Sequence, residues 1–281
     1  MSVRPQLHIT VVRHGETNSN LNHILQGHLD TKLNKVGREQ ADLVGKRLRK
    51  MKFDHIYSSD LSRAKKTAEA IAKHHPNTPF SVDMRLREKD IGRLSGLSIY
   101  EALDLIKNEG SQWEDYGESD EDFTDNILSF FDEIIDKHLP DTQGPESIEH
   151  PKKNTHILLV THGGTINKLV REHMIHDLGF LVNDYLSIRH KAKNTSVTKI
   201  VVRRKITDDV GSRSVSRRGS GVSSSDGATT PSSEASTIEI VRGVQRKPRL
   251  EGDINMWSCV AHLAKLGKRT RGDSSIDDYV H

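Results

Sequence analysis

The feature that most constrains the fold is a regular alternation of short β-rich runs with segments of helical spacing. Residues 7–12, 54–58 and 156–160 favour strands, and 80–82 and 196–202 are further candidates. Apolar side chains recur at helical spacing in residues 35–51, 61–73, 98–108, 122–138 and 165–174. Strands that alternate with helices form parallel sheets that are covered on both faces. The sequence therefore predicts an α/β fold, a three-layer αβα arrangement around a mostly parallel central sheet.

One region departs from this pattern. Residues 211–237 contain 10 Ser, 4 Gly, 3 Thr and 1 Pro, a composition that buries too little apolar surface to offset the entropy lost on ordering. We expect a disordered insertion, after which the strand-like runs 237–241 and 254–261 return to the same sheet. The predicted organisation is one domain at 1–209, the insertion at 210–237, returning strands at 238–262 and a polar tail at 263–281.

Charge and cysteine content exclude several classes of protein. Lys and Arg number 42 against 39 Asp and Glu, with the two signs interspersed, so no nucleic-acid partner is expected. The longest apolar run, residues 157–160, is far below the roughly 20 residues that cross a bilayer, so no membrane association is expected. The single cysteine, Cys259, rules out an internal disulfide and fits a reducing compartment. These features favour the cytoplasm, and they are equally compatible with the nucleus.

Two histidine–glycine pairs occupy matching positions at strand ends. Arg13-His14-Gly15 follows the run 7–12, and Thr161-His162-Gly163-Gly164 follows the run 156–160. Ligands of open parallel sheets bind at this carboxyl edge. If the two strands are neighbours, His14 and His162 face each other across one pocket. A single histidine at such a position is usually just buried and hydrogen-bonded, but two matched pairs favour a functional site.

Arginines near these histidines indicate an anionic ligand. Arg13 directly precedes His14, and Arg63 opens the helix-like segment after residues 54–58. A guanidinium stays charged and offers planar paired donors that match a phosphate. Two imidazoles also occur in metal sites, but the sequence has no H-E-x-x-H motif and no cysteine pair, and Arg13 would repel a cation. We therefore expect neither a metal nor another cofactor.

Five linked motifs carry a resemblance to a known family. They are Arg13-His-Gly-Glu-Thr-x-x-Asn20, Gln26-Gly-His-Leu-Asp30 followed by Gly37-x-x-Gln40, Ser58-Ser-Asp-Leu-x-Arg63-Ala, Leu86-Arg-Glu88, and Thr161-His-Gly-Gly164. In this order, over roughly residues 7–202, the chain resembles the histidine phosphatase superfamily, which contains cofactor-dependent phosphoglycerate mutases and fructose-2,6-bisphosphatases. The resemblance implies a phosphoglycerate mutase-like fold.

The same resemblance implies a role for each matched residue. His14 is the nucleophile that takes up the phosphoryl group, and the transferred oxygens are surrounded by Arg13, Arg63 and His162. Glu88 is the proton donor, which requires a pKa raised by burial and by the nearby phosphate. The structural alternative for Glu88 is a salt bridge with Arg85 or Arg87. Contact with the phosphate or the rest of the substrate is expected at Asn20, Gln26, Gly27 and Gly163.

The region after Glu88 favours hydrolysis over mutase chemistry. Mutases of the family grip a phosphoacid with paired arginines, which this chain lacks, and residues 109–125 are instead rich in Asp and Glu. We expect a histidine acid-type phosphatase, a phosphoric monoester hydrolase that acts on a small phosphorylated substrate through a phosphohistidine. Mutase-type phosphotransfer is one alternative. Fructose-2,6-bisphosphatase activity is another, because the sequence does not show whether its extra cations face the pocket; these are Arg85, Arg87, Lys89 and Arg93.

An interaction scaffold with this fold is an alternative of a different class, since some superfamily members serve as non-catalytic subunits. A scaffold should lack the nucleophile, the acid or the second histidine, and all three are present. The insertion can still bind partners. It contains Arg217-Arg218-Gly219-Ser220, a pattern typical of basophilic kinase sites, so a kinase acting on 211–237 is a candidate partner.

Overall fold

The computed structural model describes residues 4–139, 154–183, 187–205, 250–264 and 266. The chain divides into two compact units, Met1–Arg204 with Leu250–His281, and Lys205–Arg249. Apart from Lys205, everything described belongs to the first unit. The serine-rich insertion, its kinase site and the strand predicted at 237–241 lie outside the described residues. These expectations and the predicted domain boundaries therefore stay predictions.

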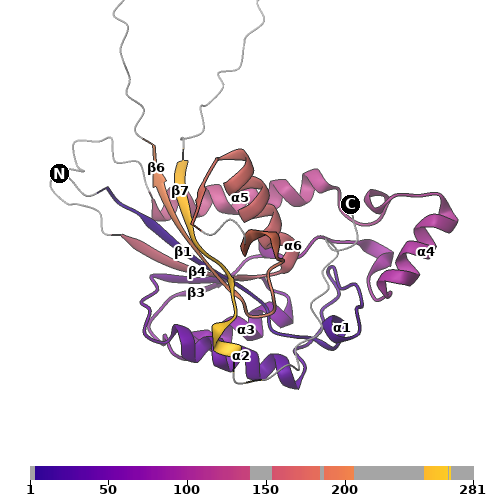
Figure 1. Cartoon of the computed structure of the whole chain (residues 1–281), viewed down its shortest axis with the longest axis horizontal. Coiled ribbons are helices and arrows are strands. Elements are labelled where there is room, and N and C mark those ends of the chain that lie inside the picture. The colour runs from indigo at the N-terminus through magenta and orange to yellow at the C-terminus, as the bar shows by residue number, and fades with distance from the viewer. Residues whose placement is uncertain (1–3, 140–153, 184–186, 206–249, 265, 267–281) are drawn as a thin grey trace, which may run out of the picture. The chain divides into compact units, whose positions relative to one another are not determined.

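A seven-stranded sheet forms the centre of the first unit, with the strand order β3-β2-β4-β1-β6-β7-β5 (Figure 1). Its strands are β1(Leu7–Arg13), β2(His55–Ser58), β3(Phe80–Val82), β4(Thr155–Thr161), β5(Leu181–Val182), β6(Val197–Arg204) and β7(Leu250–Cys259). β1 pairs in parallel with β4 and antiparallel with β6. Of these seven strands only β6 runs against the others, so the predicted mostly parallel sheet is confirmed.

Helices cover both faces of this sheet. The α-helices are α1(Asn18–Leu21), α2(Lys35–Leu48), α3(Ser62–Ala72), α4(Ile99–Glu109), α5(Asp120–His138) and α6(Gly163–Ile166). On one face, Val44 of α2 and Ile71 of α3 pack against Leu158 of β4. On the other face, Phe131 of α5 packs in one core with Leu159 of β4. The expected three-layer αβα arrangement is confirmed.

Local capping sets several helix ends. The Asn34 side chain accepts a hydrogen bond from Gly37 N at the start of α2, and Ser98 forms a capping box with Glu101 at the start of α4. Gly110 ends α4 in the left-handed conformation, with φ +63°, which a residue without Cβ adopts readily. Such side chains satisfy backbone groups that a helix end leaves without partners.

Several predicted boundaries need correction. The helix predicted at 35–51 ends at Leu48, and the strand predicted at 254–261 spans Leu250–Cys259. The helix predicted at 165–174 begins at Gly163 as α6 and continues as the π-helix η5(Asn167–Asp177). Apolar spacing of 3.6 residues per turn predicts an α-helix and does not reveal the wider turns of a π-helix. The short elements α1 and β5 were not predicted.

A small lobe stands beside the sheet and carries α4 (Figure 1). It has an apolar cluster of its own, in which Ile91, Leu94, Ile99 and Tyr116 are buried. The lobe begins directly after Glu88, so it follows a predicted site residue in the chain. Among the described residues, no helix has the length and apolar character that a membrane span requires.

Candidate active site

The parallel pairing of β1 with β4 brings the two predicted histidines together. Arg13 stands opposite Thr161 in this ladder, so His14 and His162, the next residue of each segment, leave the sheet at the same carboxyl edge. Their ring centroids lie 5.2 Å apart. Both side chains are buried, with 2% and 0% of their surface exposed. Residues 148 positions apart in the sequence thus share one site.

The His14 ring is held so that one nitrogen keeps its lone pair. Its Nδ1 lies 2.7 Å from the carbonyl oxygen of Gly15. Because a carbonyl oxygen can only accept, Nδ1 carries the proton of the neutral ring and Nε2 has none. Burial, followed by the charges of Arg63 and Arg13, holds the pKa of His14 well below its usual value. The ring is therefore neutral at neutral pH, which is the nucleophilic state of an imidazole.

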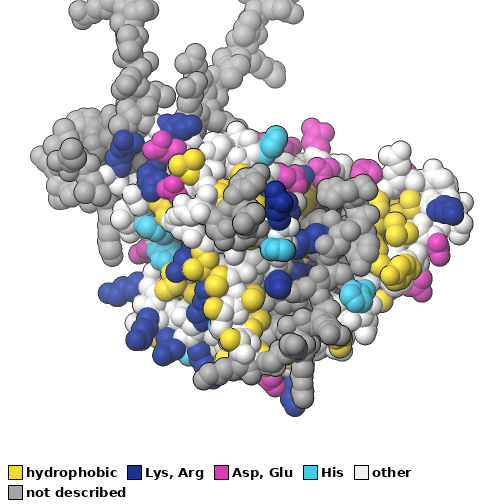
Figure 2. Space-filling model, in the orientation of Figure 1, with side chains coloured by type: hydrophobic (Ala, Val, Ile, Leu, Met, Phe, Trp, Pro, Cys, Tyr) yellow, Lys and Arg dark blue, Asp and Glu magenta, His cyan; other side chains and the backbone are white. Residues whose placement is uncertain are grey.

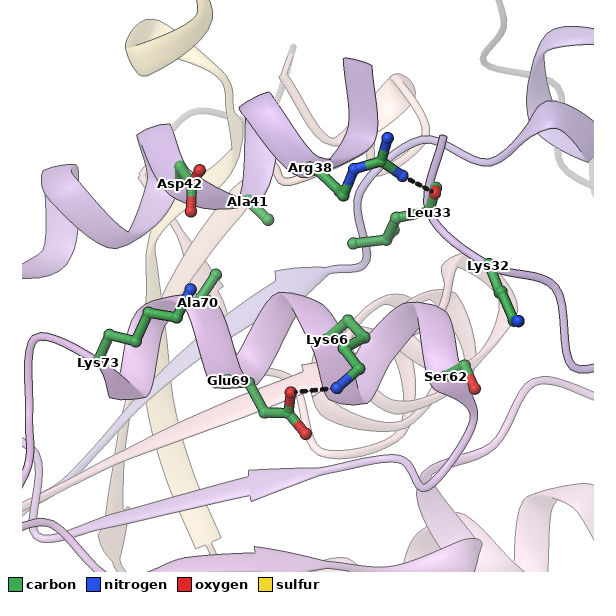
Figure 3. Close-up of a pocket in the computed structure, with 10 residues that line it drawn as sticks. All are labelled: Lys32, Leu33, Arg38, Ala41, Asp42, Ser62, Lys66, Glu69, Ala70 and Lys73. Carbon is green, nitrogen blue, oxygen red and sulfur yellow. Dashed lines mark hydrogen bonds and ion pairs between the residues drawn. The ribbon is translucent and has the colours of Figure 1, made fainter. Parts of the chain in front are cut away.

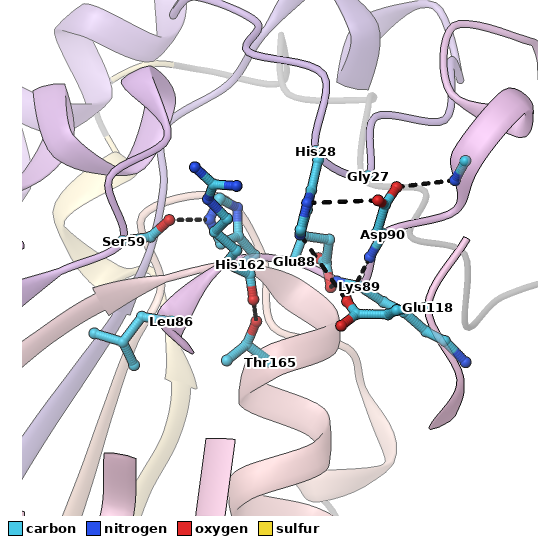
Figure 4. Close-up of polar contacts among 12 residues, drawn as sticks. Gly27, His28, Ser59, Leu86, Glu88, Lys89, Asp90, Glu118, His162 and Thr165 are labelled. Atoms are coloured by element: carbon cyan, nitrogen blue, oxygen red, sulfur yellow. Dashed lines mark hydrogen bonds and ion pairs between the residues drawn. The ribbon is translucent and has the colours of Figure 1, made fainter. Parts of the chain in front are cut away.

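His162 is held from the opposite side of the site. Its Nε2 lies 2.8 Å from Ser59 Oγ (Figure 4), whereas its buried Nδ1 has no hydrogen-bond partner among the described residues. Burial, the charge of Arg63 and the neighbouring His14 hold the pKa of His162 well below its usual value. A buried ring nitrogen without a protein partner is uncommon, and it suits a site that binds a polar ligand.

Two buried arginines supply fixed positive charge beside these rings. The Arg13 guanidinium donates from Nη1 to the carbonyl oxygen of Ala192 at 2.7 Å. Arg63 donates from Nη1 to Leu29 O and from Nη2 to Gly27 O, both at 2.9 Å. Burial lowers the pKa of Arg63 to about 10, against the opposing charge of Glu88, so Arg63 stays charged at neutral pH. Arg13 and Arg63 are 4% and 1% exposed. Two buried cations beside neutral imidazoles favour an anion as the ligand.

Glu88 reaches the same site without forming the salt bridge considered from its sequence neighbours. Its Oε2 accepts from Gly164 N at 3.0 Å and its Oε1 accepts from Lys89 N at 3.1 Å, and Figure 4 shows the carboxyl group near His162. A Cβ added at Gly164 would lie 2.2 Å from Glu88 Oε1. Glycine at 164 therefore makes room for the carboxyl group beside the start of α6. The raised pKa expected for Glu88 stays a prediction.

Arg85 and Arg87 form salt bridges with other carboxylates. The Arg85 guanidinium lies 2.7 Å from Asp83 and 2.6 Å from Glu133, and Arg87 lies 2.5 Å from Asp60. Both cations are therefore neutralised by carboxylates other than Glu88.

The remaining predicted contact residues shape the loop that follows β1. Asn20 is buried, and its Oδ1 accepts from Thr17 N at 3.1 Å. Gln26 Oε1 accepts from the Thr17 hydroxyl at 3.0 Å. Gly27 has φ +46°, and a Cβ there would lie 2.7 Å from Ile91 Cγ1. Gly27 O is one of the two carbonyl oxygens that accept from Arg63. Gly163 is buried directly after His162.

Lys89 and Arg93, two cations that follow Glu88 in the sequence, are each paired with a carboxylate. Lys89 lies 3.4 Å from Asp120, and the Arg93 guanidinium is paired with Glu109. His28 stands between Asp90 Oδ2 at 3.7 Å and Glu118 Oε1 at 4.0 Å (Figure 4). The acidic stretch noted in the sequence thus supplies partners for the cations next to the site.

Three further residues position the site, and none of them was predicted to have a role there. They are Ser59, which contacts His162; Thr67, whose hydroxyl accepts from Gly15 N at 3.0 Å; and Asn194, whose Nδ2 donates to His14 O at 2.9 Å. Of the three, Ser59 could have been found from the sequence, because it lies inside the motif around Arg63 and directly after a predicted strand. Among the described residues, no group of three or more His, Cys, Asp or Glu side chains is arranged to hold a metal ion.

Comparison with known proteins agrees with this arrangement. Residues 9–207 match the profile of the histidine phosphatase superfamily (branch 1). A probable phosphatase of Schizosaccharomyces pombe is 33% identical over 195 residues, which is 69% of this chain and 86% of the relative. A broad-specificity phosphatase of Saccharomyces cerevisiae is 33% identical over 170 residues, which is 59% of this chain and 69% of the relative.

Solved structures share the fold. The native structure of mycobacterial glucosyl-3-phosphoglycerate phosphatase has a TM-score of 0.54 at 26% identity, covering 70% of this chain and 90% of that chain. The resemblance carried by the five motifs is confirmed, and the chain belongs to branch 1 of the histidine phosphatase superfamily.

Proposed function

We propose that this protein hydrolyses phosphomonoesters through a phosphohistidine formed at Nε2 of His14, without a metal ion. The observation that carries the proposal is the state of His14: its Nδ1 proton is engaged by Gly15 O, and burial together with two arginines keeps the ring neutral. Nε2 is thereby available to attack phosphorus. The cations that suppress protonation of His14 also attract the phosphate that it attacks.

The first step transfers the phosphoryl group. The P–N bond to His14 Nε2 forms as the P–O bond to the leaving group breaks, while Arg13, Arg63 and His162 hold the three transferred oxygens. Glu88, in its protonated form, donates a proton to the departing alkoxide. Its place against Gly164 N, close to His162, supports this role.

The second step releases phosphate. Glu88, now a carboxylate, takes a proton from water, the water oxygen bonds to phosphorus, and the P–N bond breaks. His14 returns to its neutral form and inorganic phosphate leaves. Both steps thus use one carboxyl group, first as acid and then as base.

The paired outer cations favour a leaving group without a second phosphate. Arg85, Arg87, Lys89 and Arg93 are each neutralised by carboxylates of the protein, so a second anion would have to displace one of those carboxylates. This supports simple phosphomonoesters over fructose-2,6-bisphosphate and over the phosphoacid that a mutase must retain. A small phosphorylated compound is therefore the proposed partner of the site.

The test is phosphate release from p-nitrophenyl phosphate, 3-phosphoglycerate and fructose-2,6-bisphosphate in EDTA. We expect turnover to survive EDTA and to fall at least about 10³-fold in His14→Gln. His8→Gln, a change of the same kind at the other end of β1, is the matched control and keeps activity. Brief mixing with labelled substrate should trap an acid-labile, alkali-stable phosphoenzyme in the wild type and not in His14→Gln.

Other outcomes would each remove part of the proposal. Turnover that persists in His14→Gln refutes the nucleophile, and activity that EDTA abolishes and a divalent cation restores refutes the metal-free route. A higher kcat/KM for the bisphosphate than for the monoesters refutes the assignment of the leaving group. A folded wild-type protein without turnover on any ester would favour the scaffold alternative.

A further inference from the structure

A groove lies between helices α2 and α3, away from the histidine cluster. It encloses about 460 Å³, a size typical of ligand sites. Its floor is Leu33, Ala41 and Ala70, which form a small buried apolar cluster of their own. At one end the helices touch: a Cβ added at Gly45 would lie 2.8 Å from Ala70 O. Toward the start of α2 the space opens between the helices, as Figure 3 shows.

The rim of this groove carries more positive than negative charge. Lys32, Arg38, Lys66 and Lys73 line it, against Asp42 and Glu69. Lys66 is paired with Glu69 at 2.7 Å. Lys32 and Lys73 make no ion pair or hydrogen bond with any described residue, and Figure 3 shows both at the rim. Basic side chains also gather along the α2 side of the face seen in Figure 2. An apolar floor under free ammonium groups suits a segment that is both acidic and apolar.

The chain itself supplies such a segment. Residues 276–280 read Ile-Asp-Asp-Tyr-Val, two adjacent carboxylates flanked by apolar side chains. The last described stretch before them lies against α2: Arg47 Nη1 donates to Cys259 O at 2.8 Å and contacts His262 Nδ1 at 3.1 Å. Cys259 and His262 therefore lie against α2, the helix that forms one wall of the groove, although Arg47 itself does not line the groove.

The length of the connection is sufficient. Ile276 is ten positions after Leu266, and an extended chain of ten residue steps spans up to about 35 Å. Along α2 the groove-lining Arg38 is nine residues from Arg47, which corresponds to about 14 Å of helix. The extended length of the connection therefore exceeds the distance along α2 to the groove.

We propose that residues 276–280 bind in the groove between α2 and α3, with Asp277 and Asp278 toward Lys32 and Lys73 and the apolar side chains over the floor. The catalytic site is the other cationic region, but its approach carries Asp90 and Glu118, which repel an acidic segment. The groove also carries Asp42 and Glu69, but Glu69 is paired with Lys66, and Lys32 and Lys73 have no carboxylate partner among the described residues.

The first experiment is zero-length carbodiimide cross-linking of the full chain, with the joined peptides identified by mass spectrometry. We expect Asp277 or Asp278 to be joined to Lys32 or Lys73, in a yield that does not depend on protein concentration. Links from this segment only to lysines beside the catalytic site, such as Lys89 or Lys168, would overturn the proposal, as would the absence of links. A yield that rises with concentration would assign the groove to a second copy of the chain.

A charge swap tests the same contact in both directions. Lys32→Glu/Lys73→Glu removes the amines that the carbodiimide would join, so hydrogen exchange is the readout for this variant and should become faster in α2 and α3. Adding Asp277→Lys/Asp278→Lys to this variant should restore slow exchange and produce reciprocal cross-links, now from amines at positions 277 and 278 to carboxylates at positions 32 and 73. The matched control is Lys46→Glu/Lys65→Glu, which makes the same charge change on the same helices outside the groove and should alter neither hydrogen exchange nor the cross-links of the segment. Phosphate release by every variant reports that the fold is intact, and equal effects of the two lysine pairs would refute the groove as the binding site.

Discussion

Histidines gather at both ends of the central sheet, but the two groups are bound differently. At the amino end, His55, His138 and His156 each place Nε2 2.8 Å from a hydroxyl oxygen; the hydroxyls belong to Ser81, Tyr57 and Thr10, respectively. Burial is the main cause that lowers the pKa of all three, to about 4 for His55 and His156. These rings are neutral parts of the packing.

At the carboxyl end, burial also lowers the pKa of His14 and His162, but fixed arginine charge adds to it. In addition, His162 Nδ1 has no partner among the described residues. A depressed histidine pKa therefore does not by itself mark a reactive site in this protein. The distinguishing features are adjacent guanidinium groups and a buried ring nitrogen that the described part of the chain leaves without a partner.

The strongest test of this difference compares one substitution at each end. His162→Gln should lower kcat/KM for a phosphomonoester by about 10²–10³, because a ligand of the transferred oxygens is lost. His156→Gln, on the same strand at the other end, should change it less than about twofold. Steady-state rates on p-nitrophenyl phosphate measure both, and equal losses would mean that the two ends do not differ in function.

A sharper comparison concerns the leaving group. Glu88→Gln should slow hydrolysis of an alkyl phosphate by about 10²-fold, because an alkoxide needs a proton to depart. The loss should be several times smaller for p-nitrophenyl phosphate, whose phenolate leaves without one. Measurements of kcat on the two esters in parallel test whether the loss depends on the leaving group. A uniform loss on both would assign Glu88 to binding rather than to proton transfer.

The smallest expected effect is on stability at the amino end. The pKa of His55 and His156 is about 4 in the folded chain and about 6.5 in an unfolded one. Since the unfolded state then binds more protons, their contribution is complete above pH 6.5 and is lost as pH falls toward 4. We expect stability to drop by about 1–2 kcal/mol from pH 7 to pH 5, allowing for the water that reaches these rings.

Urea unfolding at the two pH values measures this drop. His55→Gln/His156→Gln should be less stable at pH 7 but should lose less between pH 7 and pH 5. An unchanged pH dependence in that variant would show that other groups titrate on unfolding.

The parts of the site that the sequence revealed are those set by local order. Arg13 ends one strand and His14 follows it, His162 follows another strand, and the alternation of strands and helices indicated that both strand ends lie at one edge. The motif around Arg63 added the third strand end. To place these residues together, no contact between distant segments had to be predicted apart from the pairing of parallel strands.

The parts that the sequence did not reveal depend on contacts between distant segments. The partner of Arg87 is Asp60, and the partner of Lys89 is Asp120, 27 and 31 residues away. Many acidic residues lie near enough in the sequence to compete for each cation, so only the folded chain decides the pairing. The contact of Asn194 with His14 O spans 180 residues and has no local pattern.

The place of β1 inside the sheet has a consequence for how the protein is made. Both neighbours of β1 are synthesised late, β4 at Thr155–Thr161 and β6 at Val197–Arg204. At about 5–20 residues per second, the ribosome needs on the order of 10–40 s to reach the end of β6 after β1. Until β4 has been made, β1 has no native strand to pair with, and its apolar side chains Leu7, Ile9 and Val11 are almost fully buried only in the finished sheet. The first strand therefore depends on the nascent chain staying unaggregated until β6 has emerged, and the histidine site is completed late in synthesis.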